Sequence, residues 1–478
     1  MIVGLVSSTR RHSLPRCIAS LSDCDQVIVV EDRERRGQAW TRNELLRHAP
    51  AGSIVRFVDD DDVAFSTRAM AERLGASGAD VLAASFISGS TREIVPTDPL
   101  AAAIDSVGPW SWVARVDAIR GIPWDGTKTR ATGTWHWLQM IDAGVRFAFA
   151  PDLWGYHWVA AANGVTAAGG APPGLFDELA RRIEAADRAD LWLPLLVRKR
   201  RACGLLAPEQ ERLVSIAVRF RDTFGQYPRL TAPVTFSEKV AARKAHEANP
   251  LFSVWCDKLA ARAWARRRLG KDLAPALLMA ATEIPDVLPP SFFAKANHGS
   301  GWFFPFEAGV HDEAIARATM AEWIRSDYGL DRGEEEYADV RKAVLLEELL
   351  PGPVRDIRLF CFGGRVEAAA IDVDWRRPTH RRDFYGRDGA WLSATQIGPN
   401  DPASTRTSKL PDAIEIADEL SAGIDFVRVD LIEADGRLYF MEMSPFPSGG
   451  NSPFSPGFDE WLGQFWTVKP WRHTAAAA

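Results

Sequence analysis

Two acidic side chains interrupt an otherwise apolar hairpin near the end of the chain. The stretch FVRVDLIEADGRLYFMEMS, residues 426–444, reads as two strands joined by a turn, with Asp430 on the first strand and Glu442 on the second. Like charges placed side by side destabilise a sheet, so these acids need a compensating partner. A divalent cation that bridges phosphates would supply it, and an ion pair with Arg428 is the alternative.

The register of this hairpin decides whether the two carboxylates share a face. A tight two-residue turn at Asp435-Gly436 would pair Asp430 with Met441 and place the acids on opposite faces. A three-residue loop or a bulge would pair Asp430 with Glu442, with Cβ atoms roughly 5 Å apart. A shared site therefore requires one of these two irregular arrangements.

A lysine lies inside a second apolar strand and is followed by a loop of small residues. In LPPSFFAKANHGSGW, Lys295 is in the strand. A buried ammonium group is costly unless it meets an anion. Gly299 and Gly301 would let backbone N–H groups approach a phosphate, and the side chains of His298 and Ser300 would add donors. The pattern predicts a phosphate site, with an ordinary turn beside a snorkelling lysine as the alternative.

Two more acidic groups follow apolar strands within the first 165 residues. VEDRE contains Glu31 and Asp32, and FVDDDDV contains Asp60 and Asp62. Short apolar strands alternate here with amphipathic helices, which predicts a parallel sheet covered on both faces. Ligands of such sheets bind beyond the carboxyl ends of the strands, where acids suit a divalent cation with a diphosphate. A solvated acidic loop is the other interpretation.

The length and composition limit the class of protein. The 478 residues indicate two or three domains, and a net charge of −6 argues against a chain dominated by a nucleic-acid-binding surface. We expect no membrane span, since no run of about 18 apolar residues occurs. The start MIVGLVSSTRR lacks the pattern of a secretion signal, and the cysteines lack metal-site spacing. We therefore expect a cytoplasmic protein with reduced thiols at Cys17, Cys24, Cys203, Cys256 and Cys361.

Composition and periodicity divide the chain into three parts. The Ala-, Gly- and Pro-rich stretch at 161–174 reads as a linker. We expect an α/β domain over residues 1–165, a linker and helical segment over 166–230, and an α+β domain over 231–478.

The first domain resembles the family 2 glycosyltransferases of the GT-A fold, a Rossmann-like fold, on the pattern RN…A…G…I…F.DDDD. The resemblance implies that Glu31 and Asp32 contact the nucleotide of a nucleotide-sugar donor. It also implies that Asp60 and Asp62 serve Mn²⁺ or Mg²⁺ and the diphosphate.

One departure from that family concerns catalysis. Inverting members carry a Glu-Asp pair at the start of a late helix, and its Asp is the base. This chain has Gly133-Thr134 there, and Thr cannot accept the acceptor's proton. His136 is a candidate substitute, and a GT-A domain that only binds its ligand is the alternative.

Residues 231–470 resemble the TupA-like branch of the ATP-grasp superfamily, which is linked to teichuronopeptide and capsule synthesis. The matching pieces include PLFSVWCDKLAAR, KANHGSG, LLEELL, DIRLFCFGGRV and VRVDL…DGRLYFMEMSPFPSGG. The implied ligands are ATP and Mg²⁺. The resemblance assigns the ATP phosphates to Lys258 and Lys295 under the loop of His298, Gly299, Ser300 and Gly301, the adenine and ribose to Glu347 and Glu348, magnesium to Asp430 and Glu442, and catalysis to Lys295, Arg358 and Arg428.

The same family pattern carries two further details. Members usually have Asn two residues after the metal-binding Glu, whereas this chain has Ser444. Gly449 and Gly450 would offer backbone donors to an acyl intermediate.

Together the resemblances predict a bifunctional enzyme. The C-terminal domain would join a small-molecule or glycan carboxylate to an amine such as an amino acid, through an acyl phosphate. The N-terminal domain would transfer a sugar, so that the two build or decorate an amide-bearing polysaccharide. The alternatives are a ligase with a recognition domain, and modification of a nucleic-acid base or natural-product scaffold.

Overall fold

The computed structural model describes residues 1–9, 13–88, 91–105, 111–128, 130–158, 174–204, 206–329, 332–375 and 377–468. The chain forms two compact units, one from Met1 to Leu206 and one that begins at Ala207. The predicted linker at 161–174 lies outside the described residues, apart from its last residue. Within the described residues, no helix combines the length and apolar character needed to cross a membrane.

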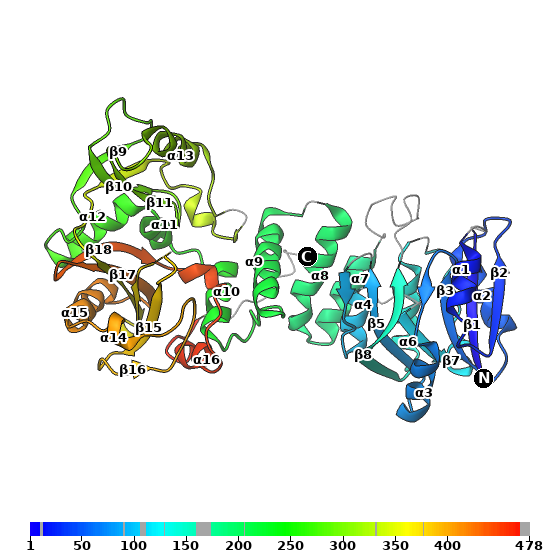
Figure 1. Cartoon of the computed structure of the whole chain (residues 1–478). Helices are drawn as coiled ribbons and strands as arrows, with labels where there is room; N and C mark the ends of the chain where they lie inside the picture. The colour runs from blue at the N-terminus through cyan, green and yellow to red at the C-terminus, as the bar shows by residue number, and fades with distance from the viewer. Residues whose placement is uncertain are drawn as a thin grey trace. The chain divides into compact units, whose positions relative to one another are not determined.

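The first unit is built on a mixed sheet, which for the described residues has eight strands in the order β2-β1-β3-β7-β5-β8-β4, with β6 paired to β5. Figure 1 shows helices packed along this sheet. The strands are β1 (Ile2–Ser8), β2 (Gln26–Glu31), β3 (Ile54–Asp59), β4 (Val63–Ala64), β5 (Val81–Ser88), β6 (Thr91–Glu93), β7 (Trp112–Arg115) and β8 (Phe147–Trp158). The helices are α1 (Leu14–Ser20), α2 (Gln38–His48), α3 (Thr67–Ser77), α4 (Pro99–Ile104), α5 (Val116–Ile119), α6 (Thr132–Asp142), α7 (Leu175–Ala185) and α8 (Trp192–Cys203).

The α/β class agrees with the prediction, but the sheet is mixed, whereas the sequence predicted a parallel one. Strand β1 runs parallel to β2 and β3, and β5 runs parallel to β8, while β7 is antiparallel to its neighbours β3 and β5. Because β2 and β3 both flank β1, their carboxyl ends reach the same edge of the sheet. Ser8 of β1 pairs with Glu31, and Ser7 pairs with Asp59.

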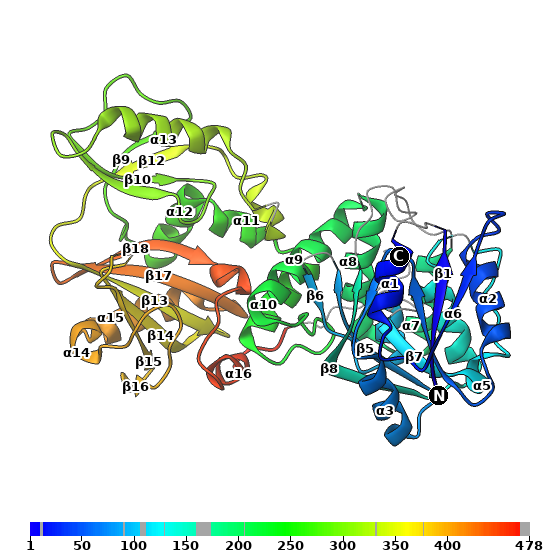
Figure 2. The same cartoon turned by 45° about the vertical axis from the view of Figure 1, so that its right-hand side comes forward.

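The second unit has two lobes, each with its own antiparallel sheet, which Figure 2 shows as separate layers. The smaller sheet has the order β11-β10-β12-β9, and the larger has the order β16-β15-β14-β13-β17-β18. The strands are β9 (Leu277–Ala281), β10 (Ser291–Ala296), β11 (Phe303–Glu307), β12 (Val344–Glu347), β13 (Val354–Phe362), β14 (Arg365–Val373), β15 (Arg381–Gly386), β16 (Trp391–Leu392), β17 (Phe426–Ala434) and β18 (Arg437–Ser444). The helices are α9 (Pro208–Phe224), α10 (Phe236–His246), α11 (Pro250–Cys256), α12 (Lys258–Leu269), α13 (Glu313–Arg325), α14 (Pro402–Thr405), α15 (Leu410–Ser421) and α16 (Phe458–Gly463), with the 3-10 turns η5 (Glu335–Tyr337) and η6 (Pro447–Gly450).

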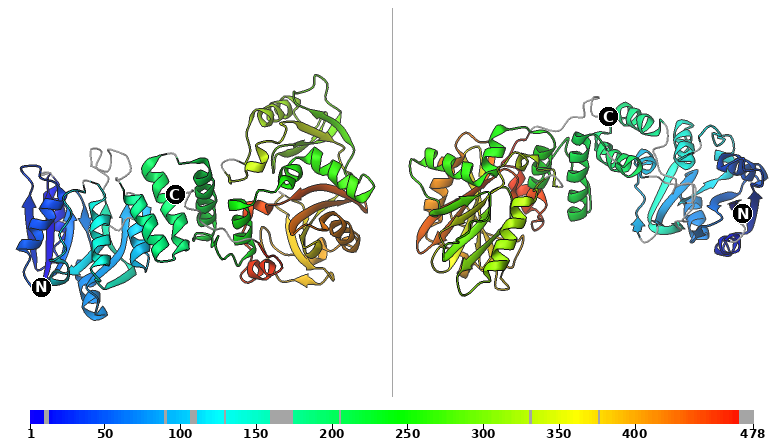
Figure 3. Two further views of the ribbon diagram at one scale, coloured as in Figure 1. Left: turned by 180° about the vertical axis from the view of Figure 1, so that it is seen from behind. Right: turned by 90° about the horizontal axis from the view of Figure 1, so that it is seen from above.

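Each lobe buries its own apolar core. In the smaller lobe, Phe292 and Leu346 of the sheet pack against Met320 of α13. In the larger lobe, the sheet packs against α10, α11, α12 and α15, with Phe236 and Trp255 among its fully buried residues. The two lobes can be followed by colour from behind and from above in Figure 3. This α+β arrangement, with a small lobe facing a large one, matches the predicted class of the C-terminal domain.

Candidate active site

The predicted acid pair forms across β17 and β18. Asp430 lies opposite Glu442, whereas the next pair toward the turn is Leu431 with Phe440. Met441 is therefore the extra residue of a β-bulge. The turn at Asp435-Gly436 remains tight, and the bulge is what brings the two carboxylates to one side.

Two arginines of the large sheet neighbour this acid pair. Arg428 donates two hydrogen bonds of 2.6 Å to the carboxylate of Asp430, and its Nη2 lies 3.7 Å from Glu442 Oε1. Arg358 of β13 reaches to within 3.9 Å of Asp430 through Nε. The ion pair considered from the sequence therefore forms, and it forms together with the acid pair.

Two lysines face the acid pair from other elements. Asp257 caps α12 by accepting a hydrogen bond of 2.9 Å from Ala260 N–H, so Lys258 stands in the first turn of that helix. Its Nζ donates to the carbonyl of Gly299, and burial lowers its pKa. Lys295 in the middle of β10 forms an ion pair of 2.6 Å with Glu347 of β12. Lys295 is thus held beside an anion, as the sequence argument required.

The surrounding cations keep Glu442 ionised. Burial by itself would raise the pKa of this carboxyl, but Lys258, Arg428 and Lys295 together lower that pKa below its usual range. A carboxylate that remains charged and is partly accessible is a suitable oxygen ligand for a hard cation.

A cavity of about 920 Å³ opens between the two sheets of the second unit. Lys295 and Phe293 come from the small sheet, and Arg358, Asp430 and Glu442 come from the large one. Its size falls in the upper part of the range that cofactor and ligand pockets occupy. The lining also contains Lys258, Ser300, Gly301, Trp375, Arg377, Arg382, Arg428 and Gly450.

Some predicted residues lie away from this cavity. His298 is buried, and its Nε2 lies 2.9 Å from the Trp323 carbonyl in the small lobe. Glu347 contacts Lys295 but does not line the cavity, and Glu348 accepts a hydrogen bond of 2.8 Å from Ala276 N–H. Gly299 does not line the cavity, but its carbonyl accepts the hydrogen bond from Lys258. The residues that the structure does group around this cavity are Lys258, Lys295, Ser300, Gly301, Arg358, Arg428, Asp430 and Glu442.

A buried charge cluster that the sequence analysis did not identify supports Arg358. Asp372 is fully buried and accepts hydrogen bonds from Arg358 and from Arg382, the latter pair at 2.7 and 2.9 Å. His380 adds a contact of 2.7 Å, and the Trp375 ring lies 4.7 Å from the Arg358 guanidinium carbon. The available signal was an acid inside the apolar run AAAIDV and a paired arginine in HRRDFY.

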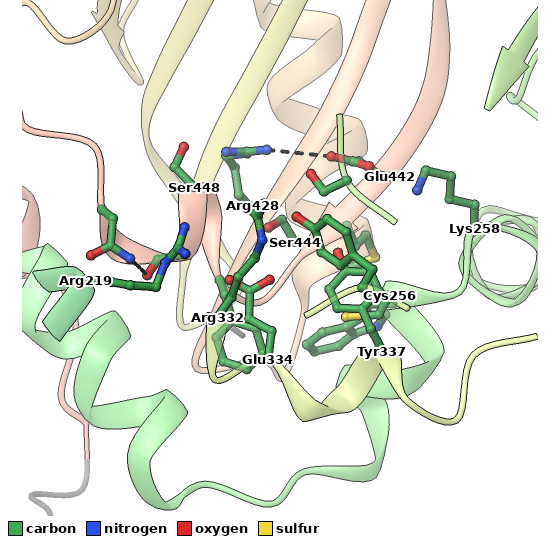
Figure 4. A pocket seen from close by; sticks show the side chains of 17 residues that line it. Arg219, Cys256, Lys258, Arg332, Glu334, Tyr337, Arg428, Glu442, Ser444 and Ser448 are labelled. Atoms are coloured by element: carbon green, nitrogen blue, oxygen red, sulfur yellow. Dashed lines mark hydrogen bonds and ion pairs between the residues drawn. The ribbon is translucent and has the colours of Figure 1, made fainter. Parts of the chain in front are cut away.

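A second, smaller cavity of about 200 Å³ adjoins the large one (Figure 4). The two cavities share five lining residues, which are Lys258, Ser300, Arg428, Glu442 and Ser448. Ser444, the residue at the family's Asn position, lines the small cavity only. Glu442, Lys258 and Arg428 thus lie where the two cavities meet, whereas Asp430 and Lys295 line the large cavity only.

In the first unit, the predicted acids lie near the carboxyl edge of the sheet. Asp32 accepts hydrogen bonds from Arg36 N–H at 2.8 Å and Gly37 N–H at 2.7 Å, so it shapes the loop after β2. Glu31 pairs with Arg33 at 2.9 Å.

Asp60 and Asp62, which follow β3, are both buried. Asp60 accepts hydrogen bonds from the Ser8 hydroxyl at 3.0 Å and Thr9 N–H at 2.7 Å, and Asp62 is 2% exposed. Within the described part of the chain, no group of three or more His, Cys, Asp or Glu side chains is arranged to hold a metal. A cation at either site would therefore need oxygens of a bound phosphate as additional ligands.

His136 does not fit the role of a replacement base. Its ring stacks on Trp124 with centroids 4.0 Å apart, its Nε2 lies 2.9 Å from the Ile122 carbonyl, and the residue is 1% exposed. Burial lowers its pKa to about 4. Thr134 accepts a hydrogen bond of 3.1 Å from Arg198. An acceptor hydroxyl cannot reach His136 in this arrangement, which corrects that expectation.

Three solved structures show distant similarity to this chain. TarS of S. aureus is 12% identical with a TM-score of 0.33, covering 92% of this chain and 77% of that chain. The D-alanine–D-alanine ligase of Bacillus anthracis, solved with ATP, is 15% identical with a TM-score of 0.26, covering 41% and 57%. The L-amino acid ligase of Bacillus licheniformis is 14% identical with a TM-score of 0.30, covering 49% and 55%. These TM-scores are too low to carry a conclusion about function.

The family comparison is more specific. No curated protein matches the chain. Residues 238–467 match the family described as TupA-like ATPgrasp, and this segment contains both lobes with Lys258, Lys295, Asp430 and Glu442. This part of the chain is therefore a TupA-like ATP-grasp domain.

Proposed function

We propose that the second unit is an ATP-dependent ligase that joins a carboxylate to an amine through an acyl phosphate. The observation that carries the proposal is the convergence of Asp430 and Glu442 with Lys258 and Lys295 at the wall of a cavity of about 920 Å³. Phosphoryl transfer needs positioning and charge neutralisation more than covalent chemistry from the protein, and such a group provides both.

Each side chain has a role in this proposal. Lys258 and Lys295 neutralise the phosphates of ATP, and the backbone at Ser300 and Gly301 covers them. Arg428 and Arg358 neutralise the phosphoryl group in transfer, and Asp372 positions Arg358. Magnesium fits Asp430 and Glu442, because Mg²⁺ is commonly held by one or two carboxylates plus substrate phosphates. When bound, it would neutralise charge on those phosphates.

The proposed reaction needs no reactant besides ATP, the carboxylate and the amine. A carboxylate oxygen of the acid attacks the γ-phosphorus of ATP, and ADP leaves with the electron pair of the broken bond. The amine nitrogen attacks the acyl carbon, phosphate leaves, and the amine proton passes to solvent. The products are an amide, ADP and phosphate.

For the first unit we propose binding of a nucleotide-sugar with Mn²⁺ or Mg²⁺ near Asp60 and Asp62. The shared carboxyl edge of β2 and β3, with Glu31 and Asp32 close by, supports this proposal. Sugar transfer would make the enzyme bifunctional in synthesis of an amide-bearing polysaccharide. Because His136 is buried, the alternative of a recognition domain is favoured over the expected transferase.

Mass spectrometry of products tests the ligase. The full-length protein is incubated with ATP, magnesium and a panel of uronic acids and amines, and ADP release is followed in parallel. A product of the mass of acid plus amine minus water, formed together with ADP, supports the proposal. ADP release that no acid and no amine stimulates would contradict it. Hydrolysis of a UDP-sugar in the same mixtures would favour the transferase over the recognition domain.

A further inference from the structure

Part of the lining of the small cavity comes from residues that precede the segment matched by the family. Arg219 on α9 lines this cavity, and the family match begins only at residue 238. Arg332 and Glu334, in the segment before η5, also line this cavity. Figure 4 shows these three side chains around the space, with Glu442 and Lys258 at its other end.

Helix α9 is fixed to the segment that carries Arg332 and Glu334. Arg212 on α9 pairs with Glu335 at 3.2 Å and with Glu336 at 2.9 Å. Gly333 packs so closely against Ile216 that an added Cβ would lie 2.8 Å from its Cγ1. The sequence predicts a linker and helical segment over 166–230, and the structure adds that Arg219 of α9 lines a cavity of the second unit.

The remaining contacts set the position of the polar groups. The guanidinium carbon of Arg332 lies 5.0 Å from the centre of the Tyr328 ring. Lys244 forms a buried ion pair of 3.4 Å with Glu334. These contacts hold the polar groups of the wall in place before any ligand arrives, which lowers the entropic cost of binding.

Charge and size restrict the ligand. The charged lining residues are four cations, Arg219, Lys258, Arg332 and Arg428, and two carboxylates, Glu334 and Glu442, which favours a ligand with a carboxylate. At about 200 Å³ the small cavity has less than a quarter of the volume of the adjoining cavity of about 920 Å³. That volume suits one amino acid and is too small for a nucleotide or a glycan chain.

We propose that the small cavity binds one free amino acid, with its carboxylate held by Arg219 and Arg332. Its amine then points to the end shared with the large cavity, where Glu442, Lys258 and Arg428 stand. This inference rests on the proposed ligase, because that end is where the acyl phosphate would form. Arg219 is thereby the residue that selects an amine carrying a carboxylate.

Calorimetry on the full-length protein tests the assignment. Each of the twenty standard L-amino acids is titrated with and without the non-hydrolysable analogue AMP-PNP and magnesium, and each acid that binds is compared with its C-terminal amide. We expect at least one acid to bind, and its amide to bind at least tenfold more weakly. A charge-assisted hydrogen bond of this kind changes affinity by about ten- to a hundredfold.

Variants test whether Arg219 contributes to amino-acid binding specifically or only to the stability of the helix. Arg219→Ala should lose about ten- to a hundredfold in amino-acid affinity and leave AMP-PNP affinity unchanged. Arg221→Ala is the matched control, because Arg221 is on the same helix but lines neither cavity. Arg332→Gln provides a second test if Arg219→Ala does not fold.

The outcomes separate this inference from the ligase itself. If AMP-PNP binds but no amino acid does, or if an amide binds as well as its acid, the assignment of the small cavity is wrong and the ligase stands. Equal amino-acid affinity in the wild type and both arginine variants would overturn it too. Failure of AMP-PNP to bind would instead contradict the proposed ligase.

Discussion

Asp430 and Glu442 face each other across β17 and β18 although the turn between the strands is tight. The unpaired Met441 absorbs the change of register, and its side chain lines the large cavity beside the two acids. A regular ladder with the same turn would have paired Asp430 with Met441. The bulge therefore places both charges on the cavity side, where Arg428 can contact both.

Replacement of Glu442 tests the magnesium assignment. Glu442→Gln keeps the side-chain volume and removes the negative charge, so we expect ADP formation to fall at least about a hundredfold while the fold remains intact. Steady-state ADP release and circular dichroism are the measurements. Glu367→Gln, which alters an acid paired with Arg365 away from both cavities, should retain full activity. Near-normal ADP formation by Glu442→Gln would contradict the assignment of magnesium to Glu442.

Lys295 should matter mainly for ATP. Lys295→Met removes an ammonium group that would attract the triphosphate, and it leaves the Glu347 carboxylate unpaired, where it would repel the triphosphate. We expect the KM for ATP to rise about ten- to a hundredfold. Lys409→Met is a suitable control, because Lys409 pairs with Asp412 and lines neither cavity. A KM for ATP that does not change would show that Lys295 serves only the packing of the lobe.

The acids of the first unit should affect a different ligand. We expect UDP or a related nucleotide diphosphate to bind with manganese or magnesium, and Asp60→Asn together with Asp62→Asn to abolish this binding. Asn preserves shape where Asp60 accepts hydrogen bonds from Ser8 and Thr9. ATP use by the second unit should not change. Calorimetry with a panel of nucleotide diphosphates, with and without metal, gives the answer, and no binding to any of them would leave this unit a scaffold.

His136 should make stability depend on pH. Burial lowers its pKa from 6.5 to about 4, so the unfolded chain binds its proton more readily than the folded chain. Stability from this group is complete above pH 6.5 and is lost as pH falls toward 4, amounting to about 2 kcal/mol between pH 7 and pH 5. Urea unfolding of the wild type and of His136→Phe at both pH values measures it. An equal pH dependence in the two proteins would contradict the prediction.

Local patterns in the sequence were enough to predict the elements and several contacts. Apolar strands carrying Lys295, Asp430 and Glu442 signal a site because buried charges need partners. A site shared by the two acids required a bulge or a three-residue loop, and the bulge is present. The alternation of strands and helices predicted the α/β class of the first unit.

Contacts between distant segments could not be predicted in the same way. Asp372 holds Arg358 and Arg382 because three strands bring them together, and no local pattern records this. His136 looked available as a base on its helix, but Trp112 and Trp124 enclose it from other segments. Arg219 lies in the predicted linker and helical segment, since periodicity shows that a helix exists and not what it packs against.

The place of α9 in the chain also determines which fragment could be used to study the proposed ligase by itself. A fragment beginning at residue 231 would keep the whole ATP-grasp match but lose the buried residues Leu213, Ile216 and Phe220. The apolar surface that these residues cover would be exposed to solvent and prone to aggregation. The small cavity would also lose the lining that α9 provides and would open to water on that side. In the proposed reaction, water would then reach the acyl phosphate, and the fragment would hydrolyse ATP without forming the amide.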